Sequence, residues 1–528
     1  MIRKAAILLL AVMMVLSLAA CGSKSPETTQ PSGDGSTQPV SAPKDSTEKK
    51  ETKETLNIAY STEPSNLATT ENNEVASYEL RTMIYSGLFK TTANGVELDL
   101  ATDYHVEKDA AGEETIWVIS LRKDVKFSDG TPLTADDVVD TLTYAKTRPQ
   151  VSQLVSFYND VEKVDDYTIK LNTNGVYATV PDSLATTATF ILPSELIAAG
   201  HDFNNNPVGS GPYKFVEWKK SEYVLLTIND NWYGEKPTIK NIKWNFIAES
   251  SSRVLALESG QVDFIVDADA LDVERLQADP KYDVSISNGS MFTYFLLQGT
   301  KEPFNDVNFR KFLASAIDRN DVIAVALNGF GTPLVGCINV NIDGTTDENA
   351  CAFNKEKAKE YLAAWGGDPK SVNFEVLVSN DTRRKVAENI QSQLAEYGIS
   401  FSIKTTESAT CSSLAKTGEY DAMIFAYTTN DFATYCKNLY YISEDSNAGN
   451  YFRMSGDDSL NAMIDVVNTT TDAAARKGYI TDYVKALNER QPVVPIFCNQ
   501  VLIAYDSHLK GLSVDSLGLY HVEYFSWE

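Results

Sequence analysis

The sequence predicts an α/β fold with more than one domain. The chain has 528 residues, too many for one ordinary hydrophobic core. Short runs of strand-like composition alternate with amphipathic runs of helical period. Hydrophobic residues make up 43% and charged residues 22%, as is normal for a globular protein. These observations together favour a mixed architecture with several cores.

Individual elements follow from local pattern. The apolar run 116–121 predicts a strand. Thr134 predicts the start of a helix, because Asp137 stands three residues later, where a carboxylate favours the first turn. Apolar residues at helical spacing predict two more helices, over 309–317 and 480–487. Core packing explains these stripes, so none is assigned a function.

The N-terminus predicts a targeting segment. Arg3 and Lys4 precede the apolar run 5–16, and small residues follow up to Cys21. This arrangement is typical of a secretory signal peptide, which we expect over 1–20. The run is shorter than the roughly 20 residues of a membrane-spanning helix, so a permanent anchor is the weaker alternative.

The residues around Cys21 resemble the bacterial lipobox, with Leu18-Ala19-Ala20 before the cysteine. That resemblance implies cleavage before Cys21 and lipidation of its new N-terminus, which would hold the protein at the membrane. Ordinary secretion with an incidental cysteine is the alternative. Residues 21–54 contain almost no large apolar side chains and predict a flexible, lipid-anchored tether.

Charge and motifs exclude several classes. The net charge of −26 opposes binding to nucleic acid, and solubility is the plain explanation for it. No hydrolase, zinc-protease or phosphate-loop motif is present. The segment 413–418 contains two β-lactamase-like motifs that share a residue, so chance explains them. The four histidines have no metal-ligand spacing, and we expect no metal, no cofactor and no enzyme activity.

Five cysteines follow Cys21. In an exported protein Cys337 and Cys351 could pair, and such a bridge would contribute about 3 kcal/mol. Cys411 with Cys436 is a second possibility. Cys498 lies in an apolar run and is expected to be a buried thiol. The sequence leaves the pairing open.

Several segments, in order along the chain, resemble the family 5 extracellular solute-binding proteins, which include oligopeptide- and dipeptide-binding proteins. The most specific is 121–138, with a Ser-Asp-Gly-Thr-Pro turn ahead of the helix at Thr134. The other matching segments are 63–67, 84–89, 207–213, 231–233, 256–263, 309–311, 316–319, 492–496 and 510–512. Most of these motifs are expected to hold the fold rather than contact a ligand.

The resemblance implies a two-lobe fold of the type II periplasmic-binding-protein class, with a hinge and an extra small domain, closing around a solute. Lobe I would comprise 55–86, 206–292 and 497–528. The small domain II would be 87–205, and lobe III would be 293–496. The apolar, extended run 292–296 fits a hinge strand.

In peptide-binding relatives, an Asp of the second lobe binds the ligand's ammonium group, after a strand and a Gly-Trp pair. An ungapped count from Asp421 places Ala426 and Tyr427 at the Gly-Trp pair and Asn430 at the Asp. An Asn accepts a weaker hydrogen bond than a carboxylate. Either Asp431 takes the role through a one-residue shift, or the protein does not recognise a free amino terminus. The ligand-binding residues that the resemblance implies are Asn72, Asn73, Glu74, Val75, Tyr158, Tyr427, Thr429, Asn430, Asp431 and Phe432.

The resemblance implies the substrate-binding component of an ABC importer, which captures oligo- or dipeptides outside the membrane and delivers them to the permease. The partners would be a peptide, the permease subunits and the membrane, through the N-terminal lipid; we expect a monomer. One alternative keeps the fold but binds an oligosaccharide or a metal chelate, which Asn430 and the many tyrosines leave open. A secreted hydrolase is a further alternative, disfavoured by the missing motifs.

Overall fold

The computed structural model divides the chain into two units, Met1–Glu51 and Thr52–Glu528. The residues it describes all belong to the second unit: 53–71, 74–92, 94–338, 340–428, 432–442, 459–515 and 518–528. The predicted signal peptide and Cys21 therefore lie outside the described residues. In the described part of the chain, no helix has both the length and the apolar character needed to cross a membrane.

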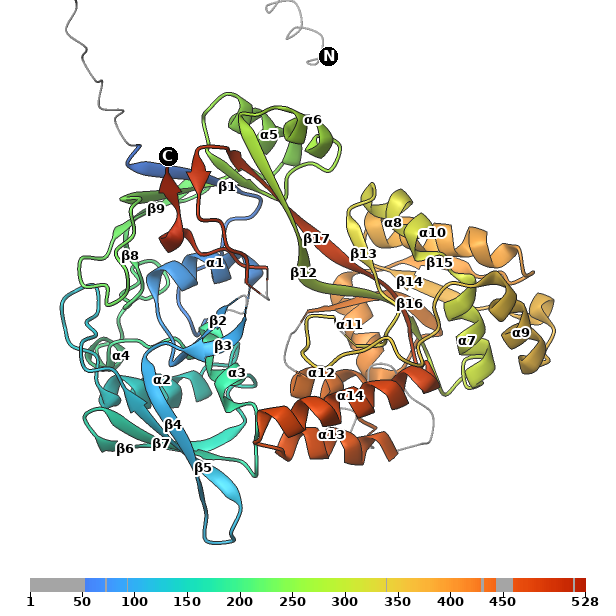
Figure 1. Cartoon of the computed structure of the whole chain (residues 1–528), viewed down its shortest axis with the longest axis horizontal. Coiled ribbons are helices and arrows are strands. Elements are labelled where there is room, and N and C mark those ends of the chain that lie inside the picture. The colour runs from blue at the N-terminus through green and yellow to red at the C-terminus, as the bar shows by residue number, and fades with distance from the viewer. Residues whose placement is uncertain are drawn as a thin grey trace, which may run out of the picture. The chain divides into compact units, whose positions relative to one another are not determined.

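One mixed sheet runs through both halves of the molecule (Figure 1). Its strand order is β15-β14-β16-β12-β17-β11-β1-β10-β9-β8, with β13 paired to β17. The strands are β1 Thr55–Tyr60, β8 Tyr213–Lys219, β9 Tyr223–Ile228, β10 Asn241–Phe246, β11 Phe264–Val266, β12 Tyr282–Leu297, β13 Gly331–Pro333, β14 Glu375–Val378, β15 Ser402–Thr405, β16 Ala422–Thr428 and β17 Val494–Asp506. The part from β8 to β11 belongs to one lobe and the part from β14 to β16 to the other.

The two long strands β12 and β17 are shared by both lobes (Figure 1). They pair antiparallel, with breaks in register after Asn288 and after Thr293. Residues 292–297 of β12 are buried, and alternate side chains enter two different cores of the second lobe. Burial on both faces explains why this stretch is continuously apolar, and it confirms the prediction that 292–296 is extended.

The first lobe places its helices and short strands around β1 and β10. These elements are α1 Val75–Ile84, α5 Ser250–Glu258, α6 Val273–Ala278, β18 Leu509–Lys510, η4 Val522–Tyr524 and β19 Ser526–Trp527. The core beside α1 surrounds the fully buried Trp244, whereas α5 and α6 pack in a smaller core of their own. An added Cβ at Gly211 would lie 2.6 Å from the backbone of Met83 and Ile84, so the loop packs directly against the end of α1.

A separate four-stranded sheet, in the order β4-β5-β7-β6, forms the small domain. Its elements are β2 Phe89–Thr92, β3 Gly95–Leu98, β4 Ala101–Lys108, β5 Glu114–Leu121, α2 Ala135–Lys146, β6 Tyr158–Asp165, β7 Thr168–Thr173, α3 Val180–Leu184, η1 Thr187–Thr189 and α4 Ser194–Ala198. The predicted strand 116–121 lies within β5. Thr134 and Asp137 form a complete capping box at the start of α2, which confirms the predicted helix start.

The second lobe is rich in helices. They are α7 Val307–Ala316, α8 Arg319–Leu327, α9 Lys355–Trp365, η2 Pro369–Ser371, α10 Asp381–Ala395, α11 Ser408–Thr417, α12 Phe432–Leu439, α13 Ser459–Thr469 and α14 Ala473–Arg490. The helices predicted over 309–317 and 480–487 correspond to α7 and α14. The buried Arg319 donates to the carbonyl oxygens of Pro495 and Ala314, at 2.8 and 3.0 Å. This family-typical residue therefore holds α8 against β17.

The lobes also meet away from the shared strands. The Ala178 N–H of the small domain donates to Asn468 O at 2.9 Å, and Arg476 Nη1 donates to Ala178 O at 3.2 Å. Thr471 Oγ1 donates to Glu114 Oε2 at 2.8 Å. We call these five residues the interlobe clasp. In Figure 1 it lies where α13 and α14 reach the four-stranded sheet.

The bridge between Cys337 and Cys351 that the sequence allowed is not formed. Both are buried free thiols, as are Cys411, Cys436 and Cys498. The Gln491 side chain occupies the space between the first two: its Nε2 donates to Cys337 Sγ at 3.6 Å, and its Oε1 accepts from the Cys351 N–H at 3.2 Å. Burial raises the pKa of both thiols, which keeps them protonated.

Candidate functional site

Strand directions define where a solute would bind. In the first lobe β1 is parallel to β10 and β11, and in the second lobe β14 is parallel to β15 and β16. Along β11 the partners on β17 run from Tyr505 to Ile503, toward the residue that pairs with Phe292. Along β16 the partners on β12 run from Leu297 to Met291. The carboxyl ends of both parallel sets therefore converge on the middle of β12, where ligands bind in open α/β sheets.

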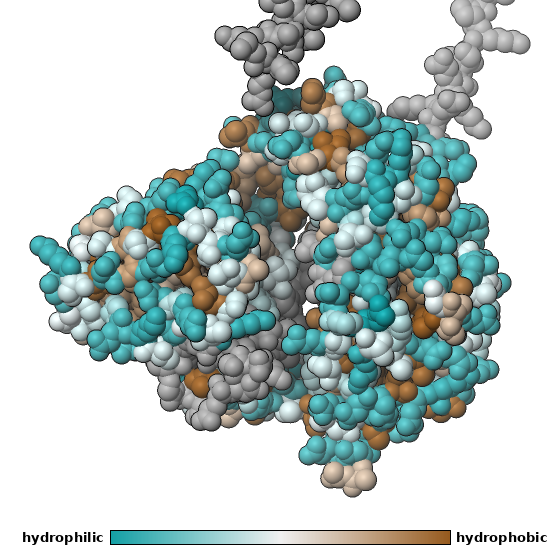
Figure 2. Space-filling model, turned by 180° about the vertical axis from the view of Figure 1, so that it is seen from behind, coloured by the Kyte–Doolittle hydropathy of each residue, from teal (hydrophilic) through white to brown (hydrophobic). Residues whose placement is uncertain are grey.

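The middle of β12 is an irregular, polar stretch. Its pairing with β17 is interrupted between Asn288 and Phe292, and Met291 keeps 38% of its surface exposed. Thr332 Oγ1 donates to Asn288 Oδ1 at 2.6 Å, and Gln500 Nε2 donates to Thr332 Oγ1 at 3.3 Å. This stretch forms the floor of the candidate site. Figure 2 shows the groove between the lobes from the back of the molecule.

The first-lobe wall carries negative charge at the carboxyl ends of β1 and β11. Tyr60 is the last residue of β1, and Asp267 directly follows β11 with a left-handed φ of 53°. Asp267 is solvent-exposed, yet desolvation by surrounding protein raises its pKa. Neighbouring protein therefore covers part of the surroundings of this exposed group. A non-glycine residue held in this conformation is also typical of functional sites.

The cationic side chain beside this wall, that of Arg253, already has hydrogen-bond partners. Arg253 of α5 donates to the carbonyl oxygens of Ile247, Ala248, Val266 and Asp267, at 2.6 to 3.0 Å. Its guanidinium therefore fixes the loops that follow β10 and β11 instead of pairing with a carboxylate. Arg253 acts on the Asp267 carboxylate electrostatically, but the two form no ion pair.

The second-lobe wall carries positive charge. Arg383 lies in the first turn of α10, just beyond the carboxyl end of β14, and its Nη1 donates to Ser379 Oγ at 2.5 Å. Desolvation lowers its pKa, and no carboxylate among the described residues forms an ion pair with it. The two walls therefore present opposite charges.

The structure places only part of the predicted site. Asn72, Asn73, Thr429, Asn430 and Asp431 lie outside the described residues. Some of their sequence neighbours are described. Thr428 ends β16 opposite Met291, and Glu74 precedes α1 and accepts from the Ser65 N–H at 3.0 Å. Val75 is the first residue of α1.

Three predicted aromatic residues have described positions. Tyr427 of β16 is half-buried, with its ring 5.9 Å from Tyr435. Phe432 is buried against Tyr483 and belongs to the core of the second lobe. Tyr158 was predicted to bind the ligand, and the structure corrects this: it is 1% exposed, and its hydroxyl donates to Leu142 O at 2.8 Å. Its ring fills the core of the small domain.

Sequence reasoning missed Tyr60, Asp267, Met291 and Arg383. One signal was available, since Asp267 is the first charged residue after the apolar run 264–266 and so marks the carboxyl end of a strand. The other three become site candidates only through strand register and burial.

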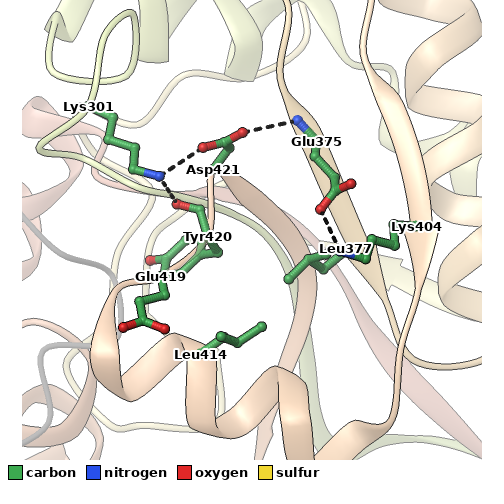
Figure 3. A pocket seen from close by; sticks show the side chains of 8 residues that line it. All are labelled: Lys301, Glu375, Leu377, Lys404, Leu414, Glu419, Tyr420 and Asp421. Atoms are coloured by element: carbon green, nitrogen blue, oxygen red, sulfur yellow. Dashed lines mark hydrogen bonds and ion pairs between the residues drawn. The ribbon is translucent and has the colours of Figure 1, made fainter.

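A separate pocket lies at the opposite edge of the second-lobe sheet (Figure 3). Its volume is about 290 Å³, and it opens beside Glu375, the first residue of β14, and Asp421, just before β16. Its lining holds two ion pairs, Lys301 with Asp421 at 2.8 Å and Lys404 with Glu375 at 3.3 Å, together with the carboxylate of Glu419. Because it lies at the amino ends of the strands, away from the edge where ligands bind in open α/β sheets, it is not the candidate solute site. The described residues also contain no cluster of three or more potential metal ligands.

A fold of two lobes joined by shared strands, with both carboxyl edges meeting at the joint, defines a solute-binding protein of the type II periplasmic class. The chain belongs to the bacterial extracellular solute-binding proteins, family 5, whose model matches residues 95–450.

Relatives agree with this assignment. The oligopeptide-binding protein AppA of Bacillus subtilis (strain 168) is 26% identical over 553 residues, covering 99% of this chain and 98% of its own. The nickel-binding protein NikA of Staphylococcus aureus (strain NCTC 8325 / PS 47) is 26% identical, covering 86% of this chain and 92% of its own. HbpA2 from Haemophilus parasuis shares the fold with a TM-score of 0.80 and 23% identity, over 90% of this chain and 100% of its own.

Proposed function

We propose that this protein captures peptides outside the cell membrane and delivers them to the permease of an ABC importer. The observation that carries the proposal is the match to an oligopeptide-binding protein along 99% of the chain. The walls of the site support it, because Asp267 on one lobe and Arg383 on the other suit a solute with a cationic and an anionic group. A zwitterionic peptide has both.

The finer assignments belong to the same proposal. Cys21 carries the lipid that ties the protein to the membrane, and the bound peptide is released unchanged, without an enzymatic step. We assign 293–496 to the moving lobe and 87–205 to the small domain. Either Asn430 or Asp431, two and three residues after Thr428, recognises the peptide's amino terminus.

Calorimetry with a pool of random hexapeptides, an oligosaccharide mixture and Ni²⁺ with histidine separates peptide binding from the alternatives. We expect saturable heat with the peptides alone, and mass spectrometry should recover them uncleaved. Binding of sugar or nickel without peptide would refute the proposal. For the anchor, the mass of the mature N-terminus should include a lipid that Cys21→Ser removes.

The amino-terminus position is tested by Asn430→Ala and Asp431→Ala. One of the two should weaken binding of peptides with a free amino terminus more than binding of N-acetylated ones. If both variants leave the two affinities intact, neither residue has this role.

A further inference from the structure

Acidic and hydroxyl side chains gather in the first-lobe wall, at the carboxyl ends of β1 and β11. Glu79 of α1 interacts electrostatically with Asp267 and Asp515, and it accepts from the Tyr520 N–H. Tyr60 and Tyr520 both interact with the carboxylates of Glu79 and Asp267. The ring of Tyr60 lies 5.4 Å from Trp244, and that of Tyr520 lies 4.9 Å from Phe264. Four polar side chains thus meet at the carboxyl ends of β1 and β11.

Two of these buried side chains have an oxygen atom without a hydrogen-bond partner among the described residues. Glu79 is 4% exposed and its Oε2 has none, and Tyr520 is 1% exposed and its hydroxyl has none. A buried polar atom without a partner destabilises the fold. Such atoms beside an exposed carboxylate, at the edge where solutes bind, indicate a place prepared for a donor that the protein itself does not supply.

The surrounding charges make the missing donor a cation. Three carboxylates contribute a charge here, those of Asp267, Asp515 and Glu523, whereas burial raises the pKa of Glu79 well above its usual range and favours its neutral form. The nearby cations are Arg253, which is bound to carbonyl oxygens, and His521, which lies 3.5 Å from Asp515 and 3.3 Å from Glu523. Three negative against two positive charges leave an excess of negative charge. The described residues do not form a metal cluster, which favours an organic cation.

We propose that Asp267, backed by Glu79 and the hydroxyls of Tyr60 and Tyr520, forms a subsite for an ammonium or guanidinium group of the bound solute. Asp267 contacts the cation directly because it is the exposed member. Glu79 lies behind Asp267, and the positive charge of a bound cation favours its ionised form. This subsite rests on the proposed function, and it adds a charge requirement from the first lobe. The cation is either the amino terminus of a peptide or a basic side chain.

The test uses three pools of random hexapeptides that contain lysine: one unmodified, one acetylated at the amino terminus, and one acetylated at every lysine. For the wild-type protein, acetylation of one of the two amines should weaken binding about tenfold. Asp267→Asn should abolish that difference while the affinity for the acetylated pool stays unchanged. Glu79→Gln should reduce the difference without lowering the melting temperature, because it replaces a buried acid by a neutral group of the same shape.

Asp269→Asn is the matched control. This carboxylate lies two residues from Asp267, but it accepts from Ser250 Oγ at 2.6 Å and from the Leu271 N–H at 3.0 Å. It should keep the tenfold preference. If wild-type protein binds all three pools equally, or if Asp267→Asn keeps the preference, the subsite is refuted and the peptide assignment stands. If no pool binds, the peptide assignment fails and the subsite fails with it.

Discussion

The interlobe clasp should set how readily the empty protein closes. Arg476 Nη1 joins α14 to Ala178 O of the small domain, and Thr471 Oγ1 joins the α13–α14 turn to Glu114. Both bonds involve a charged group and cross from one lobe to the other. Opening the groove breaks them, whereas the shared strands β12 and β17 stay paired.

The expected magnitude follows from these bonds. A hydrogen bond to a charged group contributes about 1.5 to 3 kcal/mol when buried, and about 1 kcal/mol at a half-exposed position. Arg476→Ala alone should therefore lower the closed-to-open ratio roughly fivefold, and Arg476→Ala with Thr471→Val about thirtyfold. The dissociation constant should rise by the same factors where the empty protein is mostly open.

Two measurements test this. Calorimetry with the tightest peptide of the random pool gives the dissociation constant, and small-angle X-ray scattering without peptide gives the radius of gyration. We expect weaker binding and a larger radius for the double variant, and the same radius as wild type once peptide saturates it.

Lys477→Ala is the control for the clasp. Lys477 is the next residue of α14, and its ion pair with Asp343, at 2.7 Å, lies within the second lobe. This variant should bind like wild type. Equal affinities for the double variant, the control and the wild type would refute the reasoning, as would equal weakening by both.

Three further predictions concern stability. Gly211→Ala should cost about 1 to 3 kcal/mol in the free energy of unfolding, because the new Cβ would lie 2.6 Å from the backbone of Ile84; chemical denaturation checks this, and an unchanged midpoint would contradict it. Thr134→Ala should cost about 1 kcal/mol through loss of the α2 capping box, and a cost below about 0.3 kcal/mol would contradict it. Burial raises the pKa of Asp99, which accepts from Tyr233 at 2.6 Å, to about 6. The free energy of unfolding of the wild type should therefore fall by at most about 3 kcal/mol as the pH rises from 4 to 7. Denaturation at each pH should not show that fall for Asp99→Asn, and parallel curves for the two proteins would refute the assignment.

The sequence predicted the framework better than the site. The capping box at Thr134 and the apolar stripe of α7 are local patterns whose spacing alone specifies the element, so both were predicted correctly. Gly211 lies so close to the backbone of Met83 and Ile84 that no side chain fits there, and a glycine in the sequence indicates such a position. The capping box and the stripe depend on residues within a few positions of one another, whereas Gly211 contacts Met83 and Ile84, more than 100 positions away.

Tyr158 and Asp267 show why the site was harder to predict. Carrying Tyr158 over from a resemblance assumed that the end of a helix faces the groove, but packing against Leu142 turns the ring inward. Asp267 becomes a candidate only once β11 is known to be parallel to β1 and its end is known to point at β12. That information is carried by pairings between residues some 200 positions apart, which no local pattern encodes.

The register of β12 links solute binding to movement of the lobes. Its pairing with β17 is interrupted between Asn288 and Phe292, at the point where β11 and β16 both converge. A break in the ladder lets a strand bend and twist there more easily than a regular stretch does. The floor of the site is therefore made from the backbone that must bend when the lobes rotate. A solute that touches Met291 or the amides beside it contacts this joint, while its charged ends reach the opposite walls. Contacts of the solute with both walls therefore favour the bent, closed arrangement of β12. This is the geometry that closure around a solute requires.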